Sequence, residues 1–298
     1  MKRSLLDRAA WAVAGALAVA VIASYAGVVR SGPLDPGGAP SSTLPQVEPR
    51  IPIRQPATPA GFPITISAPG SYFLTQNITA SAATDGIVIS ADGVALDLNG
   101  FVLSGASIGS AGISAAGANH VTISNGVIRD WTGAGIKGDA ITNGRYEKLQ
   151  ISGNHGGGII AGKDSLVADC QVTDNGGNGI AVVQPLTFGS SSISGCTVDG
   201  SVLDGIVVDN NVTVTGNSVT NSGVDGIHAF LAGNRIDGNH IGSSAGKEIH
   251  VEAGGNVIVR NSFSGGASDL SIVLAGNTQG PTENGGTPIS NPWANLAY

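Results

Sequence analysis

A Gly-Ile pair recurs along most of the chain at intervals of 21 to 26 residues, and this period constrains the fold more than any other feature. The pairs begin at Gly86, Gly112, Gly135, Gly158, Gly179, Gly205 and Gly226, and Glu248-Ile249 and Asp269-Leu270 continue the series. A fixed period of this length is typical of a solenoid, in which each repeat stacks only on its neighbours.

Each repeat contains short β-branched runs and no helical pattern. In the repeat that ends at Ile206, apolar residues also stand eight and thirteen positions earlier, at Val198 and Ile193. Such runs alternate with period two and are separated by Gly, Asn, Asp and Ser, which is typical of short strands joined by turns. No repeat holds the run of about ten residues that an amphipathic helix needs.

We therefore predict an all-β fold, a single-stranded right-handed parallel β-helix (a solenoid) of about nine coils. Coils of this kind stack about 4.8 Å apart, so the isoleucines of successive pairs should form one buried ladder. The prediction requires Ile159, Ile180, Ile206 and Ile227 to lie along one axis.

Residues 1–29 are predicted to be a signal peptide or a membrane anchor, formed by an apolar helix. The segment opens with three basic residues, continues with an apolar run over residues 9–23, and offers a cleavage site at Ser24-Tyr25-Ala26. If it is retained, residues 9–29 could tether the protein to a membrane. Either outcome predicts an extracytoplasmic protein, whether secreted, periplasmic or on the cell surface.

The rest of the chain divides by composition. Residues 30–62 are predicted to be a Pro-rich linker, since eight of the 14 prolines fall between Pro33 and Pro59. Residues 63–298 are predicted to form the β-helix, with residues 63–85 as an N-terminal cap and residues 275–298 as a closing tail. Residues 183–188 are predicted to form a protruding loop.

The charge balance excludes one class of partner. The chain has 14 Lys and Arg against 21 Asp and Glu, a formal net charge of −7, and only 4% aromatic residues. An acidic surface with few aromatic side chains argues against nucleic-acid binding. It also argues against direct capture of polyanions unless a bound cation bridges the charges.

Three stretches support a resemblance to a known group of proteins. They are VALDLNGFVLSG at residues 94–105, the repeated G-I/V-x-V…N-x-I/V-x-N pattern, and the NPWANL ending. Together they resemble right-handed parallel β-helix repeat proteins of the pectin-lyase-like superfamily. The resemblance implies the fold, but the superfamily includes lyases, hydrolases, epimerases, binding proteins and adhesins. The N-T-D, D-D, G-H-G and R-I-K motifs of polygalacturonase-like sites are absent, so no catalytic residue is assigned.

Alternation along the strand that starts at each Gly-Ile places two rows of side chains outside. One row contains His228 and His250, and the other contains Asp209, Phe230 and Glu252. We predict that these five residues face water on three neighbouring coils and bind carbohydrate. Asp209 and Glu252 would lie roughly 10 Å apart, near the carboxylate separation of inverting glycosidases. The alternative is an ordinary polar outer surface.

Asp204 and Asp225 stand two residues before the isoleucine in adjacent repeats. Asp-Gly is a common turn pair, so a turn role explains them. The functional alternative is a calcium site, and Ca²⁺ is the one cofactor that the sequence suggests.

One further position is shared by polar and thiol side chains. It holds Asn217, Asn239 and Asn261, which predict a buried structural ladder of hydrogen-bonded amides. The same position holds Cys170 and Cys196 in earlier repeats. Their Cα atoms should lie about 5 Å apart, so either a disulfide or two buried thiols is expected.

The function predicted from these features is an exported protein that binds or processes extracellular or cell-envelope polysaccharide. One alternative is a structural or adhesive surface module without catalysis. A second alternative is a polysaccharide lyase, glycoside hydrolase or epimerase, so the sequence leaves open whether the protein is an enzyme.

Overall fold

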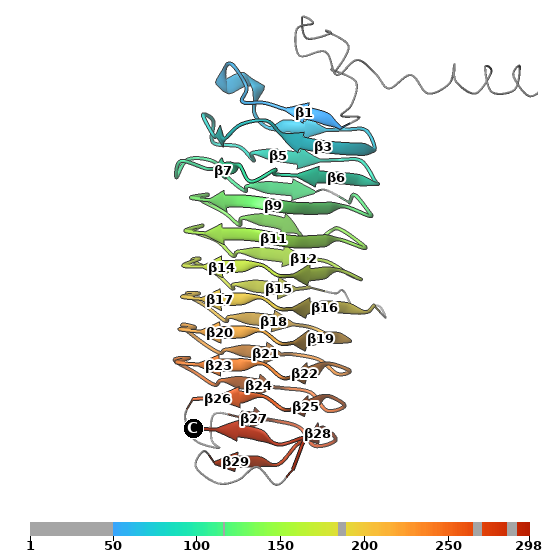
Figure 1. Cartoon of the computed structure of the whole chain (residues 1–298), viewed down its shortest axis with the longest axis vertical. Helices are drawn as coiled ribbons and strands as arrows, with labels where there is room; N and C mark the ends of the chain where they lie inside the picture. The colour runs from blue at the N-terminus through green and yellow to red at the C-terminus, as the bar shows by residue number, and fades with distance from the viewer. Residues whose placement is uncertain (1–49, 116, 184–188, 265–269, 285–290) are drawn as a thin grey trace, which may run out of the picture. The chain divides into compact units, whose positions relative to one another are not determined.

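The chain forms a right-handed parallel β-helix, in which successive coils stack along one axis (Figure 1). The computed structural model describes residues 50–115, 117–183, 189–264, 270–284 and 291–298. The chain divides into two units, Met1–Glu48 and Pro49–Tyr298. The predicted signal or anchor, most of the predicted linker and residues 184–188 of the predicted loop lie outside the described residues.

Each coil contributes one strand to a ten-stranded parallel sheet. Its strands are β2 (Ile64–Ile66), β5 (Ile87–Ile89), β8 (Ile113–Ala115), β10 (Ile136–Gly138), β12 (Ile159–Ala161), β15 (Ile180–Val182), β18 (Ile206–Val208), β21 (Ile227–Ala229), β24 (Ile249–Val251) and β27 (Leu270–Ile272).

The remaining strands form a twenty-stranded sheet that bends into two columns, because most coils add two strands to it. The first column contains β1 (Ile51–Ile53), β3 (Gly70–Leu74), β6 (Val94–Asp97), β13 (Leu166–Ala168), β16 (Ser191–Ser194), β19 (Val212–Thr215), β22 (Arg235–Asp237), β25 (Val257–Val259) and β28 (Thr278–Gln279). The second contains β4 (Ile78–Thr79), β7 (Val102–Ser104), β14 (Gln171–Thr173), β17 (Thr197–Asp199), β20 (Ser218–Thr220), β23 (His240–Gly242), β26 (Ser262–Phe263), β29 (Thr282–Asn284) and β30 (Asn295–Ala297). Two longer strands, β9 (Thr122–Arg129) and β11 (Arg145–Ser152), run through both columns.

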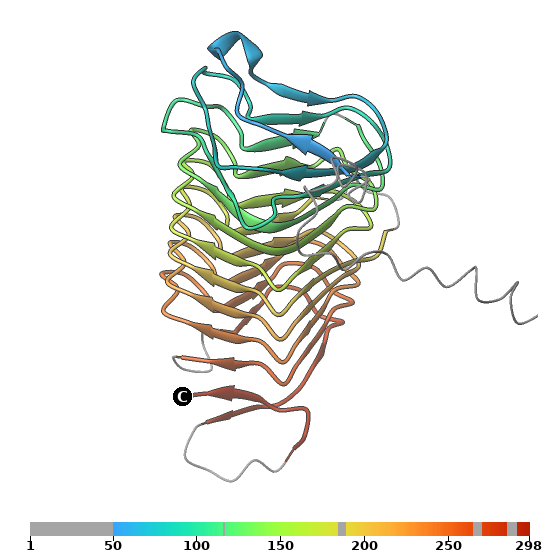
Figure 2. The ribbon, with the colours of Figure 1, turned by 45° about the horizontal axis from the view of Figure 1, so that its top comes forward.

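The predicted isoleucine ladder is continuous. Ile159 pairs with Ile180, Ile180 with Ile206, and Ile206 with Ile227, and all four are fully buried. In the oblique view of Figure 2 the coils bend at the same points, so equivalent strands lie directly over one another. The prediction of a β-helix built on aligned isoleucines is therefore confirmed.

The β-helix starts earlier than predicted. Strand β1, inside the predicted linker, pairs in parallel with β3, and both Ile53 and Phe62 are buried. A short 3₁₀ helix, Pro59–Gly61, connects β1 to the first coil. The prolines obscured this edge strand, because proline is tolerated where one side of a strand has no partner.

Residues 63–85 form a full coil in place of the separate cap that was predicted. Ile64 in β2 pairs with Ile87, and β3 and β4 pair with β6 and β7. Pro63 stands where later coils have the glycine of the Gly-Ile pair, which hid this coil in the sequence. The described residues thus contain ten coils, where about nine were predicted.

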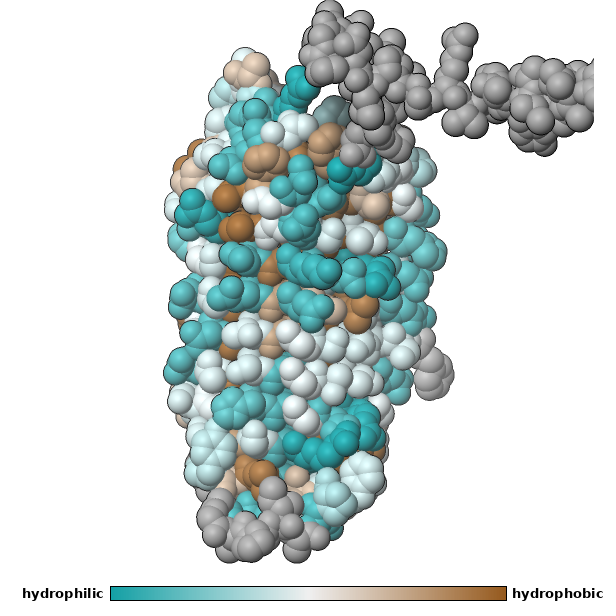
Figure 3. Space-filling model, in the orientation of Figure 1, coloured by the Kyte–Doolittle hydropathy of each residue, from teal (hydrophilic) through white to brown (hydrophobic). Residues whose placement is uncertain are grey.

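The described parts of the predicted closing tail add strands to the last coils. Strand β28 pairs with β25, and β30 lies between β26 and β29. On the face shown in Figure 3, hydrophobic residues are scattered singly or in short runs among hydrophilic ones. In the described part of the chain, no helix has both the length and the apolar character needed to cross a membrane.

Candidate functional site

The site begins with two aspartates at the bends before β21 and β18. The glycines that follow them, Gly205 and Gly226, turn into the interior, where a Cβ would approach Val219 Cγ1 and Ile241 Cγ2 to 2.3 Å. This close packing leaves no room for a side chain, and the chain bends at each glycine, between the aspartate and its strand. As a result, the aspartates lie beside the outward side chains of the ten-stranded sheet.

Each aspartate uses one carboxylate oxygen to hold the next coil. Asp204 Oδ1 accepts a hydrogen bond from the backbone N–H of Asp225 at 2.8 Å. Asp225 Oδ1 accepts one from the N–H of Lys247 at 2.6 Å. One oxygen of each carboxylate thus joins its coil to the next, and the second oxygen of each makes other contacts.

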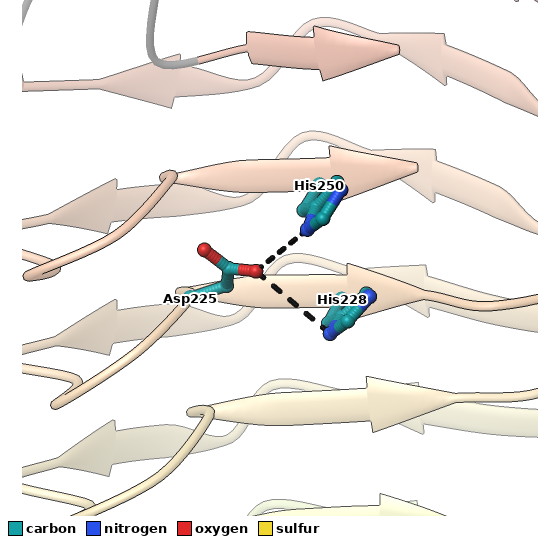
Figure 4. A group of neighbouring side chains, drawn as sticks. All are labelled: Asp225, His228 and His250. Carbon is teal, nitrogen blue, oxygen red and sulfur yellow. Dashed lines mark hydrogen bonds and ion pairs between the residues drawn. The ribbon is translucent and has the colours of Figure 1, made fainter. Parts of the chain in front are cut away.

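The second oxygens meet the two histidines of β21 and β24. Asp225 Oδ2 lies 2.8 Å from His250 Nδ1 and 3.8 Å from His228 Nδ1. Figure 4 shows the carboxylate of Asp225 directed toward both rings, which lie on successive strands. Asp204 Oδ2 lies 3.4 Å from His228 Nδ1. Two carboxylate oxygens, one from each of two coils, therefore lie beside Nδ1 of His228.

A carboxylate and an aromatic ring complete the cluster. Glu252 Oε1 lies 3.1 Å from His228 Nε2, so both ring nitrogens of His228 face carboxylates. The rings of His228 and His250 stack with centroids 4.5 Å apart and an angle of 11°. Phe230 packs on His228 at 4.0 Å and is 38% exposed, so it covers the imidazole and presents an apolar face to solvent.

His228 is not the water-facing residue that alternation predicted, since it is only 8% exposed. The neighbouring rings and carboxylates cover it. Burial opposes protonation of the imidazole, but the hydrogen bonds with Asp204 and Glu252 and the charges of Asp204 and Asp225 outweigh burial and raise the pKa of His228 above its ordinary value. The cluster thus favours a cation at this position.

Asp209 shares a row with Phe230 and Glu252, as the spacing predicted. The register pairs Val208 with Ala229 and Ala229 with Val251, so the residues that follow these three are equivalent. The backbone carbonyl of Asp209 accepts hydrogen bonds from Leu231 N–H and from Asn234 Nδ2. The cluster around His228 is formed by the other four candidates together with the two aspartates.

The sequence analysis placed these side chains in two unrelated groups, the aspartate row and the histidine row. Simple alternation puts residues three positions apart on opposite faces of a strand, and Asp225 and His228 are three apart. The bend at Gly226 removes that restriction. One feature of the sequence could have predicted that the two rows meet. It is the Asp-Gly-Ile-His order at residues 225–228, together with a histidine at the equivalent position of the next coil.

Three of these residues are arranged as metal ligands. Asp225, His228 and His250 each offer one ligand atom, and these atoms all lie within 4.8 Å of one another. The calcium site considered for Asp204 and Asp225 would need a shell of oxygens, whereas the neighbours of their second oxygens are imidazole nitrogens.

The asparagines form the buried amide ladder. Asn217 Nδ2 donates to Asn239 Oδ1 and Asn239 Nδ2 donates to Asn261 Oδ1, each at 3.0 Å, and Asn261 continues the ladder to Asn295. Each amide oxygen also accepts the backbone N–H of the previous coil, as in Asn217 N to Asn239 Oδ1 at 3.0 Å. These amides therefore have a structural role and lie inside the coils.

The two cysteines are free, buried thiols, and the disulfide considered for them is absent. Their side chains stack in parallel, and their sulfurs approach carbonyl oxygens: Cys170 Sγ lies 3.3 Å from Ala168 O, and Cys196 Sγ lies 3.4 Å from Ser194 O. The hydrogen bond between the thiols, together with burial, raises the pKa of Cys170 far above its ordinary value. Both thiols occupy buried positions inside the coils.

A second surface feature lies near the last coils. A groove of about 420 Å³ is lined by residues that include Arg235, Val257, Gln279 and Trp293. Trp293 is 52% exposed, and the guanidinium of Arg260 lies 5.3 Å from its ring. An exposed indole beside polar side chains could stack on a sugar ring.

Comparisons with known proteins bear on the fold. The family model described as "Right handed beta helix region" matches residues 85–230. No curated protein matches the chain.

Among solved structures, the chain is similar to two Azotobacter vinelandii proteins. The A-module of mannuronan C-5 epimerase AlgE6 has a TM-score of 0.58 and 16% identity, over 82% of this chain and 86% of that one. The A-module of mannuronan C-5 epimerase AlgE4 has a TM-score of 0.55 and 13% identity, over 83% of each chain. The Dettilon tailspike protein (gp208) has a TM-score of 0.52 and 13% identity, over 83% of this chain and 60% of that one. Similarity at these identities establishes the fold alone.

Proposed function

We propose that this chain, a right-handed parallel β-helix, is a member of the pectin-lyase-like superfamily and binds or processes a polysaccharide on the outer face of β18, β21 and β24. The cluster of Asp204, Asp225, His228, His250 and Glu252, which we call the His–Asp cluster, lies on that face beside Phe230. From residues 1–29 we place this activity outside the cytoplasm.

The observation that carries the proposal is the combination of an exposed aromatic ring with ionisable groups. A sugar presents an apolar face of C–H groups and a rim of hydroxyls, so its recognition needs an aromatic platform and nearby hydrogen-bonding groups. Phe230 supplies the platform, and the carboxylate of Glu252, with 44% of its side chain exposed, supplies acceptors. Asp209 extends the row by one coil.

The solved structures that share the fold support the substrate class. Two of them are mannuronan C-5 epimerases, and mannuronan is a polysaccharide. The third is a tailspike protein. If the bound polysaccharide is also processed, Glu252 is the group best placed to transfer a proton, because 44% of its side chain is exposed and its carboxylate lies 3.1 Å from His228 Nε2.

The test is retention of the purified full chain in gels that contain single polysaccharides, both neutral and anionic. Phe230→Ala and the double variant Asp209→Ala with Glu252→Ala should each lose about tenfold or more in affinity for the polysaccharide that retards the parent. Ser114→Ala is the matched control, since Ser114 occupies the position of His228 five repeats earlier on the same face. Equal retention of parent and variants on every polysaccharide would remove the proposal.

The same samples separate binding from processing. A lyase creates an unsaturated product with ultraviolet absorbance, a hydrolase creates reducing ends, and an epimerase exchanges the sugar C–H with solvent deuterium. Binding without any of these signals would make the protein a polysaccharide-binding module. Trp293→Ala is included because the groove near the last coils offers another aromatic platform. Loss of binding in Trp293→Ala alone would move the contact surface to that groove.

A further inference from the structure

The two ring nitrogens of His228 face only hydrogen-bond acceptors in the cluster. Nδ1 lies 3.4 Å from Asp204 Oδ2 and Nε2 lies 3.1 Å from Glu252 Oε1. A neutral imidazole carries one N–H, so it can donate to only one of these carboxylates. The other nitrogen then directs a lone pair at an anionic oxygen. A metal ion bound to that nitrogen would replace this contact between two acceptors with a coordinate bond.

The geometry on the Nδ1 side suits a metal ion. Asp225 Oδ2, His228 and His250 present ligand atoms that all lie within 4.8 Å of one another, and the Asp225–His250 separation is 2.8 Å. Ligands at about 2.0 Å from one tetrahedral ion lie about 3.3 Å apart. Binding of one ion therefore requires the two imidazoles to rotate out of their stacked arrangement, in which the ring planes differ by 11°. Figure 4 shows the carboxylate of Asp225 with dashed lines to one nitrogen of each imidazole, on the successive strands β21 and β24.

The surroundings supply what a ligand histidine needs. Glu252 Oε1 lies 3.1 Å from His228 Nε2, where it can accept an N–H, and the tautomer that carries the proton on Nε2 leaves Nδ1 free to bind a metal. Asp204 Oδ2, beside the same Nδ1, is available as a fourth ligand or as an acceptor for a bound water. Three carboxylates and two imidazoles also leave the cluster with excess negative charge. The side chains of Asp204, Asp225 and His228 are nearly covered, so a divalent cation would offset that charge where water cannot.

We infer that Asp225, His228 and His250 bind a divalent transition-metal ion of the zinc type. Two imidazole nitrogens and one or two carboxylate oxygens are the ligands that Zn²⁺ and similar ions accept, whereas Ca²⁺ takes six to eight oxygens. The inference concerns the proposed contact surface but does not depend on polysaccharide binding. Metal binding without retention on any polysaccharide would overturn the proposed function alone.

The experiment uses full chain without a polyhistidine tag, treated with a chelator and then dialysed. Isothermal titration with Zn²⁺, with the bound metal counted by mass spectrometry, should give one ion per chain, and Ca²⁺ should not replace it. His250→Ala and Asp225→Asn should each weaken Zn²⁺ binding by about 100-fold or more, and Glu252→Gln by about 10- to 100-fold, because it only orients His228. Asp225→Asn keeps an oxygen for the N–H of Lys247, so the variant retains the turn.

Two histidines elsewhere serve as controls. His155→Ala and His240→Ala should bind Zn²⁺ like the parent, since neither residue belongs to the cluster. Circular dichroism and the melting temperature establish that each variant is folded. If His228→Ala fails to fold, His250→Ala and Asp225→Asn still decide the question. Binding weaker than millimolar in the parent, or binding that persists in the folded His250→Ala and Asp225→Asn variants, would overturn the inference and leave a second proton on His228 as the explanation of the cluster.

Discussion

An early coil and the late coils use one backbone arrangement for different chemistry. In the early coil, Asp85 Oδ1 accepts the backbone N–H of Ala111 at 3.0 Å, and Asp85 Oδ2 accepts the hydroxyl of Ser114 at 2.6 Å. A neutral hydroxyl satisfies the carboxylate, and the contact ends there. This pair joins two coils and nothing more.

In the late coils the same two oxygens perform the same two tasks, but the partner is a histidine. Asp204 holds the N–H of Asp225 and faces His228, and Asp225 faces His250 one coil later. Because two such pairs stack directly, the imidazoles come together with two carboxylates. The comparison shows that the bend before each strand is a property of the fold, and that the residue after the isoleucine decides whether the carboxylate meets a hydroxyl or an imidazole.

The interiors of the two regions should be equivalent, and this gives the largest predicted effect. Ile113→Asp and Ile206→Asp each place a carboxylate in a fully buried ladder. Each should destabilise the fold by about 4 kcal/mol or more, because the charge has no partner inside the coils. Denaturant unfolding followed by circular dichroism measures this. Lys137→Asp, on an exposed outward position, should stay within about 0.5 kcal/mol of the parent. A variant of either isoleucine that unfolds like the parent would show that its ladder is not interior.

The second prediction distinguishes Asp225 from Asp85, although each accepts a backbone N–H of the next coil. Asp225→Asn should weaken Zn²⁺ binding by about 100-fold or more, whereas Asp85→Asn should leave it unchanged. Both changes keep an amide oxygen for the next coil's N–H, so both should cost only about 1 kcal/mol of unfolding free energy. Calorimetric titration and thermal unfolding supply the two readouts. Equal loss of metal affinity in both variants would mean that the effect is transmitted through the fold and does not come from the ligand.

The difference between these regions also shows which features could be predicted from the sequence. The isoleucine ladder was predictable, because burial of one position per coil imposes a period that the chain repeats. The His–Asp cluster was only half predictable. Its members were visible as outward and turn residues, but their meeting depends on the bend at Gly226, and alternation treats each strand as straight.

The ends of the β-helix were hidden for a different physical reason. A coil is recognised by its Gly-Ile pair, and the first coil has Pro63 before Ile64. Strand β1 contains Pro52, which an interior strand would exclude but an edge strand permits. Both features occur at the end of the β-helix, where a coil has a neighbour on one side only. The repeat pattern is therefore least regular at the boundary that has to be predicted.

A third prediction concerns another row shared by early and late coils. Asp97 in β6 and Asp237 in β22 occupy equivalent positions through successive pairings of the first column. Asp97 pairs with Arg50 at 2.7 Å, whereas Asp237 contacts Arg260 and Arg235 together. The hydrogen bond from Arg260, the contacts with Arg235 and both positive charges outweigh burial and hold the pKa of Asp237 below its ordinary value.

A carboxylate whose pKa is lower in the folded than in the unfolded chain stabilises the fold above the unfolded pKa. That stability is lost as the pH falls through the folded pKa. The melting temperature of the parent should therefore drop more steeply below about pH 4 than that of Asp237→Asn. The two curves should run parallel at neutral pH. If the melting temperatures of the parent and of Asp237→Asn fall equally at acidic pH, the two arginines do not favour the ionised carboxylate.

The smallest predicted effect concerns the row that contains Cys170 and Cys196 in earlier coils and asparagines in later ones. Asn217 Oδ1 accepts the backbone N–H of Cys196 at 2.9 Å, as each later amide oxygen accepts the N–H of the coil before it. In Cys196→Asn, the introduced amide can donate to Asn217 Oδ1 and extend the ladder by one coil. It also loses the thiol contact with Cys170, so the net change should stay within about 1 kcal/mol. Cys196→Leu is the contrasting variant, because it brings extra volume and no donor to a filled position, and it should cost about 1 to 3 kcal/mol. Unfolding free energies that rank the two variants in the opposite order would show that volume, and not hydrogen bonding, decides what this row accepts.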